Sequence, residues 1–111
     1  AMKPQLRKGT LEMCVLAVLA RHDSYVYEIV STLAQSMDIS EGTIYPLMRR
    51  LQADDWVSTY LVESASGPAR KYYRLTPAGG EALAAMRREW GSFVAEINAV
   101  LGHDGPEGDT P

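Results

Sequence analysis

The sequence holds a single cysteine and no apolar run long enough to cross a bilayer. Because Cys14 has no second cysteine to pair with, no disulfide can form within the chain, which fits a reducing compartment. The longest apolar run, residues 13–20, is far shorter than the roughly 20 residues of a membrane-spanning helix. No signal-peptide layout is present. These features predict a cytoplasmic protein, and a length of 111 residues predicts one domain with a modest core.

The sequence also lacks the residue patterns that carry most enzymatic chemistry. It contains no cysteine–histidine cluster at metal-ligand spacing, no glycine-rich phosphate loop and no paired histidines. Cys14 falls on the apolar face of an expected helix, where a buried structural thiol is far commoner than a nucleophile. His22 ends that helix, and His103 lies in a polar C-terminal stretch. The sequence therefore predicts neither an enzyme nor a bound metal or cofactor.

Positive charge is scarce in total, but it is unevenly distributed. The formal net charge is −3, yet residues 1–80 carry nine Lys/Arg and eight Asp/Glu, whereas residues 81–111 carry two and six. The acidic excess is thus confined to the C-terminal end, and the basic residues elsewhere come in small clusters. Local clusters matter more than the total for nucleic-acid binding, so the acidity of the chain does not exclude it.

Two N-terminal segments show the apolar spacing of amphipathic helices. The first covers residues 6–23, and its inward-facing residues are Leu11, Val15, Leu16, Val18 and Leu19. The second covers residues 24–37 and has Ser24 as its expected N-cap residue. Its inward-facing residues are Ile29, Val30 and Leu33.

A third helix is expected over residues 38–55. Either Asp38 or Ser40 is suited to cap it, and Asp38 with Glu41 three residues later has capping-box spacing. Its apolar stripe recurs at the spacing of one helix face and consists of Ile44, Leu47, Met48 and Leu51. The opposite face carries Gly42, Pro46 and two arginines, and packing in a core does not explain this combination.

The periodicity then changes from that of a helix to that of strands. Residues 56–63 and 70–75 are rich in β-branched and aromatic residues, and they flank a Ser/Gly/Pro turn at 64–69. Thr76 as N-cap and Pro77 at the first position restart a helix, whose first turn is weakened by Gly79 and Gly80. Three helices, a hairpin and a helix are the layout of a mainly α winged helix-turn-helix fold, with residues 40–53 as recognition helix.

This layout divides the chain into three parts. Residues 1–76 are expected to form the winged helix-turn-helix domain and residues 77–102 a C-terminal dimerisation helix. Residues 103–111, a Gly/Pro/Asp-rich stretch, are expected to be a disordered tail.

The last helix carries a heptad-like apolar stripe. Its members are Leu83, Met86, Trp90, Phe93, Ile97 and Val100, at spacings that alternate between three and four residues. A domain this small has little core left to bury so long a stripe. The stripe therefore predicts a two-fold dimer, although a helix that folds back onto its own domain is the alternative. Trp90, at the centre, would then be an interface anchor or the floor of an apolar cavity between subunits.

Three motifs together resemble one known family. "YVYEI" at 25–29, "SEGTIYPLMRRL" at 40–51 and "SGPARKYYRLTPAG" at 66–79 resemble, in this order and spacing, bacterial PadR-type transcriptional regulators. The single C-terminal helix resembles the compact subfamily. The resemblance implies a repressor that binds a palindromic operator as a homodimer and is released by a small molecule. Some relatives bind flat aromatic compounds beside a tryptophan of this helix, which would make Trp90 an effector-binding residue.

The chain departs from the family pattern at several positions. Val26 stands where the family often has glycine. In "LQADDWV", at 51–57, Gln52, Asp55 and Trp56 replace the residue types of the usual Leu-Glu-x-x-Gly-Leu-Ile.

A candidate DNA-binding surface follows from the layout. At the start of the third helix, Gly42 permits close approach, while Ser40, Thr43 and Tyr45 offer hydroxyl donors to phosphates or base edges. Arg49 and Arg50 lie on the outward face, either as DNA contacts or as a solvated helix surface. The remaining candidates come from other segments, and they are Arg70, Lys71, Tyr27 and Lys8.

These additional candidates carry different expectations. Arg70 and Lys71 are neighbours in a strand and face opposite sides, so we expect only one of them to meet DNA fully. Arg70 is the preferred candidate, and the alternative role for Lys71 is an ion pair with an acid. Of Tyr72 and Tyr73, at least one is expected in the core. Tyr27 contacts the DNA backbone by resemblance, or it is a packed aromatic residue. Lys8, with Lys3 and Arg7, forms a basic N-terminal arm suited to phosphates. The main alternative is a winged-helix module that binds protein instead of DNA.

Overall fold

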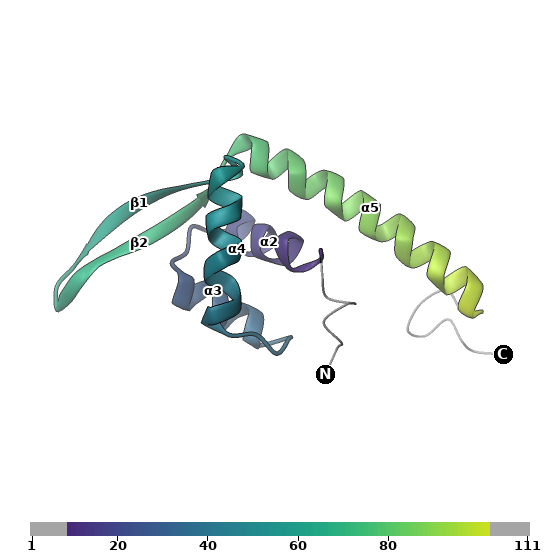
Figure 1. Ribbon diagram of the computed structural model, residues 1–111, viewed down its shortest axis with the longest axis horizontal. Helices are drawn as coiled ribbons and strands as arrows, with labels where there is room; N and C mark the ends of the chain where they lie inside the picture. Colours follow the sequence, from purple (N-terminus) through teal and green to yellow (C-terminus); the bar gives the residue numbers. More distant parts are fainter. Residues whose placement is uncertain (1–8, 103–111) are drawn as a thin grey trace.

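The computed structural model describes residues 9–102. Its elements are α2 (Leu11–Arg21), α3 (Val26–Ala34), α4 (Glu41–Ala53), β1 (Val57–Ser64), β2 (Gly67–Leu75) and α5 (Pro77–Leu101). The three shorter helices pack together, the hairpin extends from one side of them, and α5 runs away from the other (Figure 1). The predicted winged helix-turn-helix layout is confirmed. The predicted basic arm with Lys8 and the predicted tail lie outside the described residues. Within residues 9–102, no helix is both long and apolar enough to cross a membrane.

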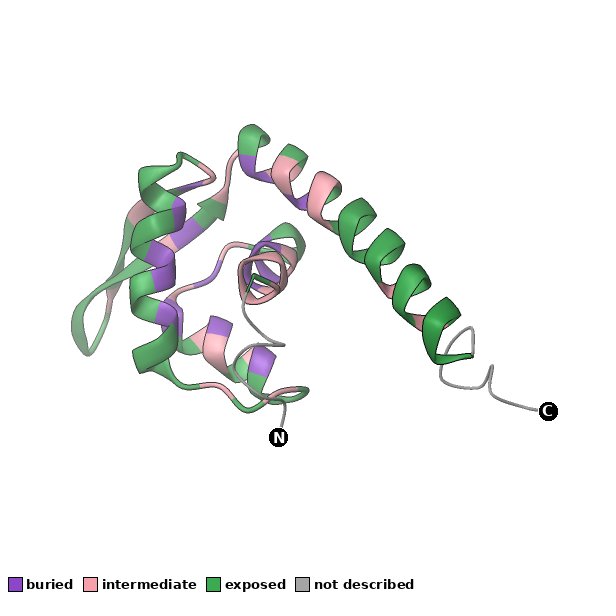
Figure 2. Ribbon diagram, turned by 45° about the vertical axis from the view of Figure 1, so that its right-hand side comes forward, coloured by how far each residue is buried: buried purple, intermediate pink, exposed green. Residues whose placement is uncertain are grey.

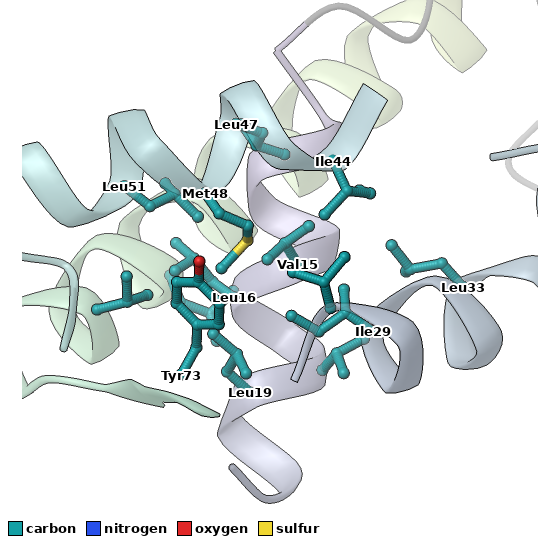
Figure 3. Close-up of a cluster of buried hydrophobic side chains, with 14 residues drawn as sticks. Val15, Leu16, Leu19, Ile29, Leu33, Ile44, Leu47, Met48, Leu51 and Tyr73 are labelled. Atoms are coloured by element: carbon teal, nitrogen blue, oxygen red, sulfur yellow. The ribbon is translucent and has the colours of Figure 1, made fainter. Parts of the chain in front are cut away.

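The core forms where the apolar faces of α2, α3 and α4 meet. Figure 3 shows side chains from all three helices pointing toward one another around Leu16 and Met48. The hairpin closes the core with Val57 and Tyr73, which are both buried. Tyr73 is thus the member of the Tyr72–Tyr73 pair that belongs to the core, as expected. Burial of this cluster is the main stabilising contribution of the domain.

The start of α3 differs from the prediction. Tyr25, and not Ser24, is the N-cap residue, and its backbone N–H donates to the Glu28 carboxylate at 3.3 Å. Ser24 is fully buried instead. Its backbone pairs with that of Tyr73, with N···O distances of 3.2 and 2.8 Å, so the α2–α3 connection forms an isolated β-bridge with the hairpin. Ser24 therefore precedes the cap, and its buried backbone N–H and C=O groups are paired with Tyr73 of β2.

The start of α4 shows which of the two predicted N-cap residues, Asp38 or Ser40, is used. Ser40 is the N-cap residue, and the predicted capping box of Asp38 with Glu41 is wrong. The Ser40 hydroxyl lies 3.4 Å from the Thr43 hydroxyl, at hydrogen-bonding distance. The first turn of α4 thus begins at the surface with two short hydroxyl side chains side by side.

The turn between α4 and β1 explains the unusual sequence at 51–57. Asp55 has φ of 61°, in the left-handed region where glycine is favoured. The Trp56 N–H donates to the Leu51 carbonyl at 3.0 Å and closes the end of the helix. Asp55 therefore adopts the conformation that the family's usual glycine would adopt, and aspartate is among the few other residues that tolerate it.

The start of α5 is held against this turn. The Thr76 hydroxyl caps the helix by accepting from the Gly79 N–H at 3.0 Å, as predicted, and donates to the Asp55 carbonyl at 2.7 Å. Gly79 packs directly on the Trp56 carbonyl, so a Cβ at this position would overlap that oxygen. Gly79 is therefore required by a close approach of backbones. The expectation that it merely weakens the helix was incomplete.

Only the first turns of α5 are covered by the domain. Leu83, which was expected at a dimer interface, is only 6% exposed and lies in the core of its own domain. Met86 packs partly against the same core. Beyond these two residues the helix is mostly exposed, as Figure 2 shows. Trp90, Phe93, Ile97 and Val100 are all exposed there, so the helix does not fold back over the stripe.

Replacement of Gly79 by alanine tests the close approach at the start of α5. We expect Gly79→Ala to lower the free energy of unfolding by about 1–3 kcal/mol, because the methyl group forces the helix away from Trp56. Gly80→Ala is the matched control, since its Cβ would meet nothing nearer than 4.0 Å, and it should stabilise by up to ~1 kcal/mol. Urea unfolding measures both. Equal effects of the two substitutions would contradict the argument.

Candidate nucleic-acid interface

An open pocket lies where the starts of α3 and α4 meet β2. It brings together four of the predicted DNA-binding residues, Tyr27, Tyr45, Arg70 and Lys71, from three elements. The other lining residues are Tyr25, Val26, Glu41 and Tyr73. Hydroxyl groups and two cations thus border one concave surface. The carboxylate of Glu41 also borders it, although the sequence did not predict Glu41 as part of the site.

The first turns of α4 present the predicted contacts at the surface. Ser40, Gly42, Thr43 and Tyr45 are all exposed, because the buried stripe of the helix faces the core on the other side. A Cβ at Gly42 would meet only the Ser40 hydroxyl, at 3.9 Å. The protein's own packing therefore does not require a glycine here. The absence of a side chain at Gly42 leaves room for another molecule to approach the backbone from outside.

The two arginines of α4 have different surroundings. Arg49 is exposed, and no described residue forms an ion pair or hydrogen bond with its side chain. Arg50 instead forms an ion pair with Glu12 of α2, with its Nη2 at 2.8 Å and its Nε at 2.9 Å from the same carboxylate oxygen. Arg50 is thus turned toward α2 by a surface pair, which contributes little stability. Of the two, Arg49 is the guanidinium available to a ligand.

The two hairpin cations both border the pocket, but they contact different aromatic rings. The Arg70 guanidinium lies 4.9 Å from the centre of the Tyr25 ring. The Lys71 ammonium lies 5.5 Å from the centre of the Tyr73 ring. The expected acid partner of Lys71 is not found among residues 9–102, where its contact is aromatic.

Three tyrosines form a row that runs from the α2–α3 connection across the hairpin. The sequence analysis did not predict this row. The Tyr72 ring lies 5.3 Å from Tyr25 and 5.7 Å from Tyr60, centre to centre. At the end of the row, the Tyr60 hydroxyl donates to Asp23 at 2.7 Å, and this hydrogen bond raises the pKa of Tyr60. Arg74 lies over the Tyr60 ring and 3.4 Å from the same carboxylate. The row depends on the pairing of Ser24 with Tyr73, which local sequence patterns do not encode.

This surface suits recognition better than catalysis. Its donors are hydroxyls, a guanidinium and an ammonium, the groups that contact phosphates and base edges. Burial raises the pKa of the Cys14 thiol, which lies half-buried on α2 away from the pocket lining. In the described part of the chain, no three His, Cys, Asp or Glu residues gather closely enough to hold a metal ion.

Comparison with known proteins agrees with this geometry. Residues 15–85 match the Transcriptional regulator PadR-like family, a family of regulators and not of enzymes. A PadR-like transcriptional regulator from Bacillus cereus is 36% identical, with a TM-score of 0.80, and the match covers 88% of this chain and 97% of that one. A transcriptional regulator of Mycobacterium tuberculosis is 39% identical over 71 residues, which are 63% of this chain and 64% of the relative.

The fold extends to a more distant structure. Bacillus subtilis PadR, solved in complex with operator DNA, is 22% identical with a TM-score of 0.65, and the match covers 71% of this chain and 46% of that one. At this identity the likeness concerns the fold alone. The family match and the Bacillus cereus structure each span well over half of the sequence. The chain therefore belongs to the PadR-like family of transcriptional regulators.

Proposed function

We propose that this protein is a ligand-responsive repressor that binds a palindromic DNA operator as a homodimer in the bacterial cytoplasm. The observation that carries the proposal is the exposed face of α4, which presents Ser40, Thr43, Tyr45 and the unpaired Arg49. Tyr45 of this face lines one pocket together with the hairpin cation Arg70. The operator DNA bound to Bacillus subtilis PadR, a protein of the same fold, supports DNA as the partner.

The geometry suits the insertion of α4 into a major groove. Its exposed N-terminal half carries small and hydroxyl side chains, which allow the backbone to come close to the bases. The free backbone N–H groups and the dipole at the start of the helix favour a nearby phosphate. Arg49 and Arg70 would then supply charge-assisted contacts to phosphates or base edges.

The exposed part of α5 supports the dimer. Trp90 and Phe93 lie with their ring centres 6.3 Å apart, and together with Ile97 and Val100 they form an apolar strip with no cover from the described residues. Large contiguous apolar strips on a surface mark interaction sites. A second copy packed on this strip would place two α4 helices on one side of a two-fold axis, as a palindromic operator requires.

The effector site would lie at the same interface. Trp90 is 43% exposed and sits one helical turn from Phe93, so two such pairs would face each other across the dimer axis. A flat aromatic compound between them would alter the spacing of the two recognition helices. Such coupling between sites lowers operator affinity if the ligand binds more tightly to the spacing that DNA does not accept.

Arg49 provides the first test of DNA binding. Arg49→Ala should lose at least ~1 kcal/mol of operator binding, about fivefold in Kd, with the fold intact. Arg50→Ala is the matched control and should lose less, because its side chain is already paired with Glu12. Fluorescence anisotropy against the duplex upstream of the protein's own gene, with a scrambled duplex beside it and salt varied, measures both.

The titration also separates DNA binding from the alternative of a protein-binding module. A preference for the upstream duplex with a steep salt dependence supports an autoregulating repressor. Weak and equal binding to both duplexes favours the protein-binding module. Unchanged affinity in Arg49→Ala, with specific binding by the wild type, would contradict the role assigned to this arginine.

The dimer is tested by a charge placed in the apolar strip. Phe93→Asp should reduce the mass measured by sedimentation equilibrium from that of two chains to that of one, because the interface would bury an unpaired carboxylate. Ala95→Asp is the control, since Ala95 is exposed on the opposite side of the same helix. A dimer that survives Phe93→Asp unchanged would show that the strip is not the interface.

The effector site is tested by tryptophan fluorescence. Titration with planar aromatic compounds should give a saturable change in emission that is lost in Trp90→Phe, where Trp56 remains as the only tryptophan. Trp56→Phe should retain the full change, because Trp56 lies at the α4–β1 turn and not on the strip. Absence of any saturable change in the wild type would count against an aromatic effector at this site.

A further inference from the structure

We infer that Tyr25 is a positioning residue that holds Arg70 of the hairpin in the orientation for contact with DNA. The inference rests on the proposed DNA-binding function, and it assigns the DNA contact to Arg70 and the control of its geometry to Tyr25. The two side chains meet in a cation–π contact, with the Arg70 guanidinium 4.9 Å from the centre of the Tyr25 ring.

Arg70 needs such support because it lies on the exposed part of the hairpin, beyond the residues that are buried in the core. Val57 and Tyr73 are buried there, whereas residues 67–71 of β2 are exposed throughout. The hairpin extends from the three-helix body in Figure 1. A long arginine side chain on such an extension samples many rotamers, and ordering it on DNA would cost conformational entropy. A ring beneath the guanidinium restricts the side chain already in the free protein, so less conformational entropy is lost on binding.

Tyr25 is itself fixed from several directions. Its backbone N–H donates to Glu28, and the pairing of the preceding residue, Ser24, with Tyr73 sets its place opposite Tyr72. The Tyr72 ring packs edge-on against it at 5.3 Å. Tyr25 also directly precedes α3, which packs against α4 in the core. The position of Arg70 is thereby tied to the position of the recognition helix.

The tyrosine row extends this support to the far strand of the hairpin. Tyr72 stacks on Tyr60 of β1, with an interplanar angle of 17°. The Tyr60 hydroxyl is bound to Asp23, two residues before Tyr25 in the chain. The row therefore begins and ends on the same short connection between α2 and α3. Both strands of the hairpin are held to the segment that carries Tyr25.

The cation–π contact leaves Arg70 able to bind a phosphate. A guanidinium that lies over a ring uses its face, and its N–H groups remain in the plane, directed outward. None of these groups has a hydrogen-bond or ion-pair partner among residues 9–102. A phosphate oxygen pair at the rim of the pocket could accept two of them.

A double-mutant cycle tests this inference on the full chain. The variants are Tyr25→Leu, Arg70→Ala and the double variant, and Tyr25→Phe is the control that keeps the ring. The probe is the tightest duplex that the wild type selects from a random-sequence pool, measured by anisotropy at several salt concentrations. We expect Arg70→Ala and Tyr25→Leu each to weaken binding by about fivefold or more, and the double variant to be no weaker than Arg70→Ala. Tyr25→Phe should bind as the wild type does.

A second readout does not depend on DNA. In the free protein, the Tyr25 ring should shift the Arg70 side-chain proton resonances upfield, and this shift should vanish in Tyr25→Leu and persist in Tyr25→Phe. Unfolding curves of all variants show whether Tyr25→Leu remains folded. A general loss of structure would move the unfolding curve, whereas loss of positioning alone moves the Arg70 resonances and the affinity.

The possible failures are distinguishable. If the losses from Tyr25→Leu and Arg70→Ala are additive, or if Tyr25→Phe is as weak as Tyr25→Leu, the inference is overturned while the proposed function stands. An unshifted Arg70 resonance in the wild type overturns it as well. If the wild type selects no sequence from the pool, the proposed function itself fails and this inference falls with it.

Discussion

The backbone pairing between Ser24 and Tyr73 is the interaction on which the candidate site depends. Two hydrogen bonds join the α2–α3 connection to β2 and form an isolated β-bridge at the base of the two-stranded hairpin. The pairing is protected from water, since Ser24 is fully buried and Tyr73 belongs to the core. Because side chains alternate across a sheet, it directs Tyr73 into the domain and places Tyr25 beside Tyr72 on the other face. The pocket, the tyrosine row and the place of Arg70 all follow from this register.

A second joint relates the hairpin to the long helix. Trp56 lies at the end of the α4–β1 turn. The Thr76 N–H donates to the Trp56 carbonyl at 3.0 Å, and Gly79 packs on the same carbonyl. The Thr76 hydroxyl in turn binds the Asp55 carbonyl. These contacts close the two ends of the hairpin onto each other and set the direction in which α5 leaves the domain. The start of α5, from which the apolar strip extends, is therefore held against the end of α4.

The features that could be predicted from the sequence are those that local periodicity and capping chemistry determine. The buried stripe of α4, the hairpin and the Thr76 cap were confirmed, because each depends on residues a few positions apart. The cap at Ser24 was predicted differently from what the structure shows, and the ion pair of Arg50 with Glu12 was not foreseen. In both, a partner distant in sequence, Tyr73 or Glu12, determines the outcome. The tyrosine row and the packing of Gly79 were missed for the same reason, since no local pattern reveals which residues meet across the fold.

The acidity of the whole chain fits the proposed DNA-binding face once charge is related to position. The described domain is elongated, 58 Å along its longest axis and 28 and 22 Å along the others, and α5 leads away from the hairpin (Figure 1). The excess of acid lies in residues 81–111, whereas residues 1–80 carry one more basic than acidic residue. Charges separated by more than roughly 10 Å are largely screened at 0.1 M salt, so Glu96, near the C-terminal end of α5, exerts little force at the hairpin. Such a distribution leaves local contacts at Arg49 and Arg70 effective while it limits the general attraction to DNA of any sequence. Binding by this chain would then depend more on the fit of α4 to a particular groove than on net charge.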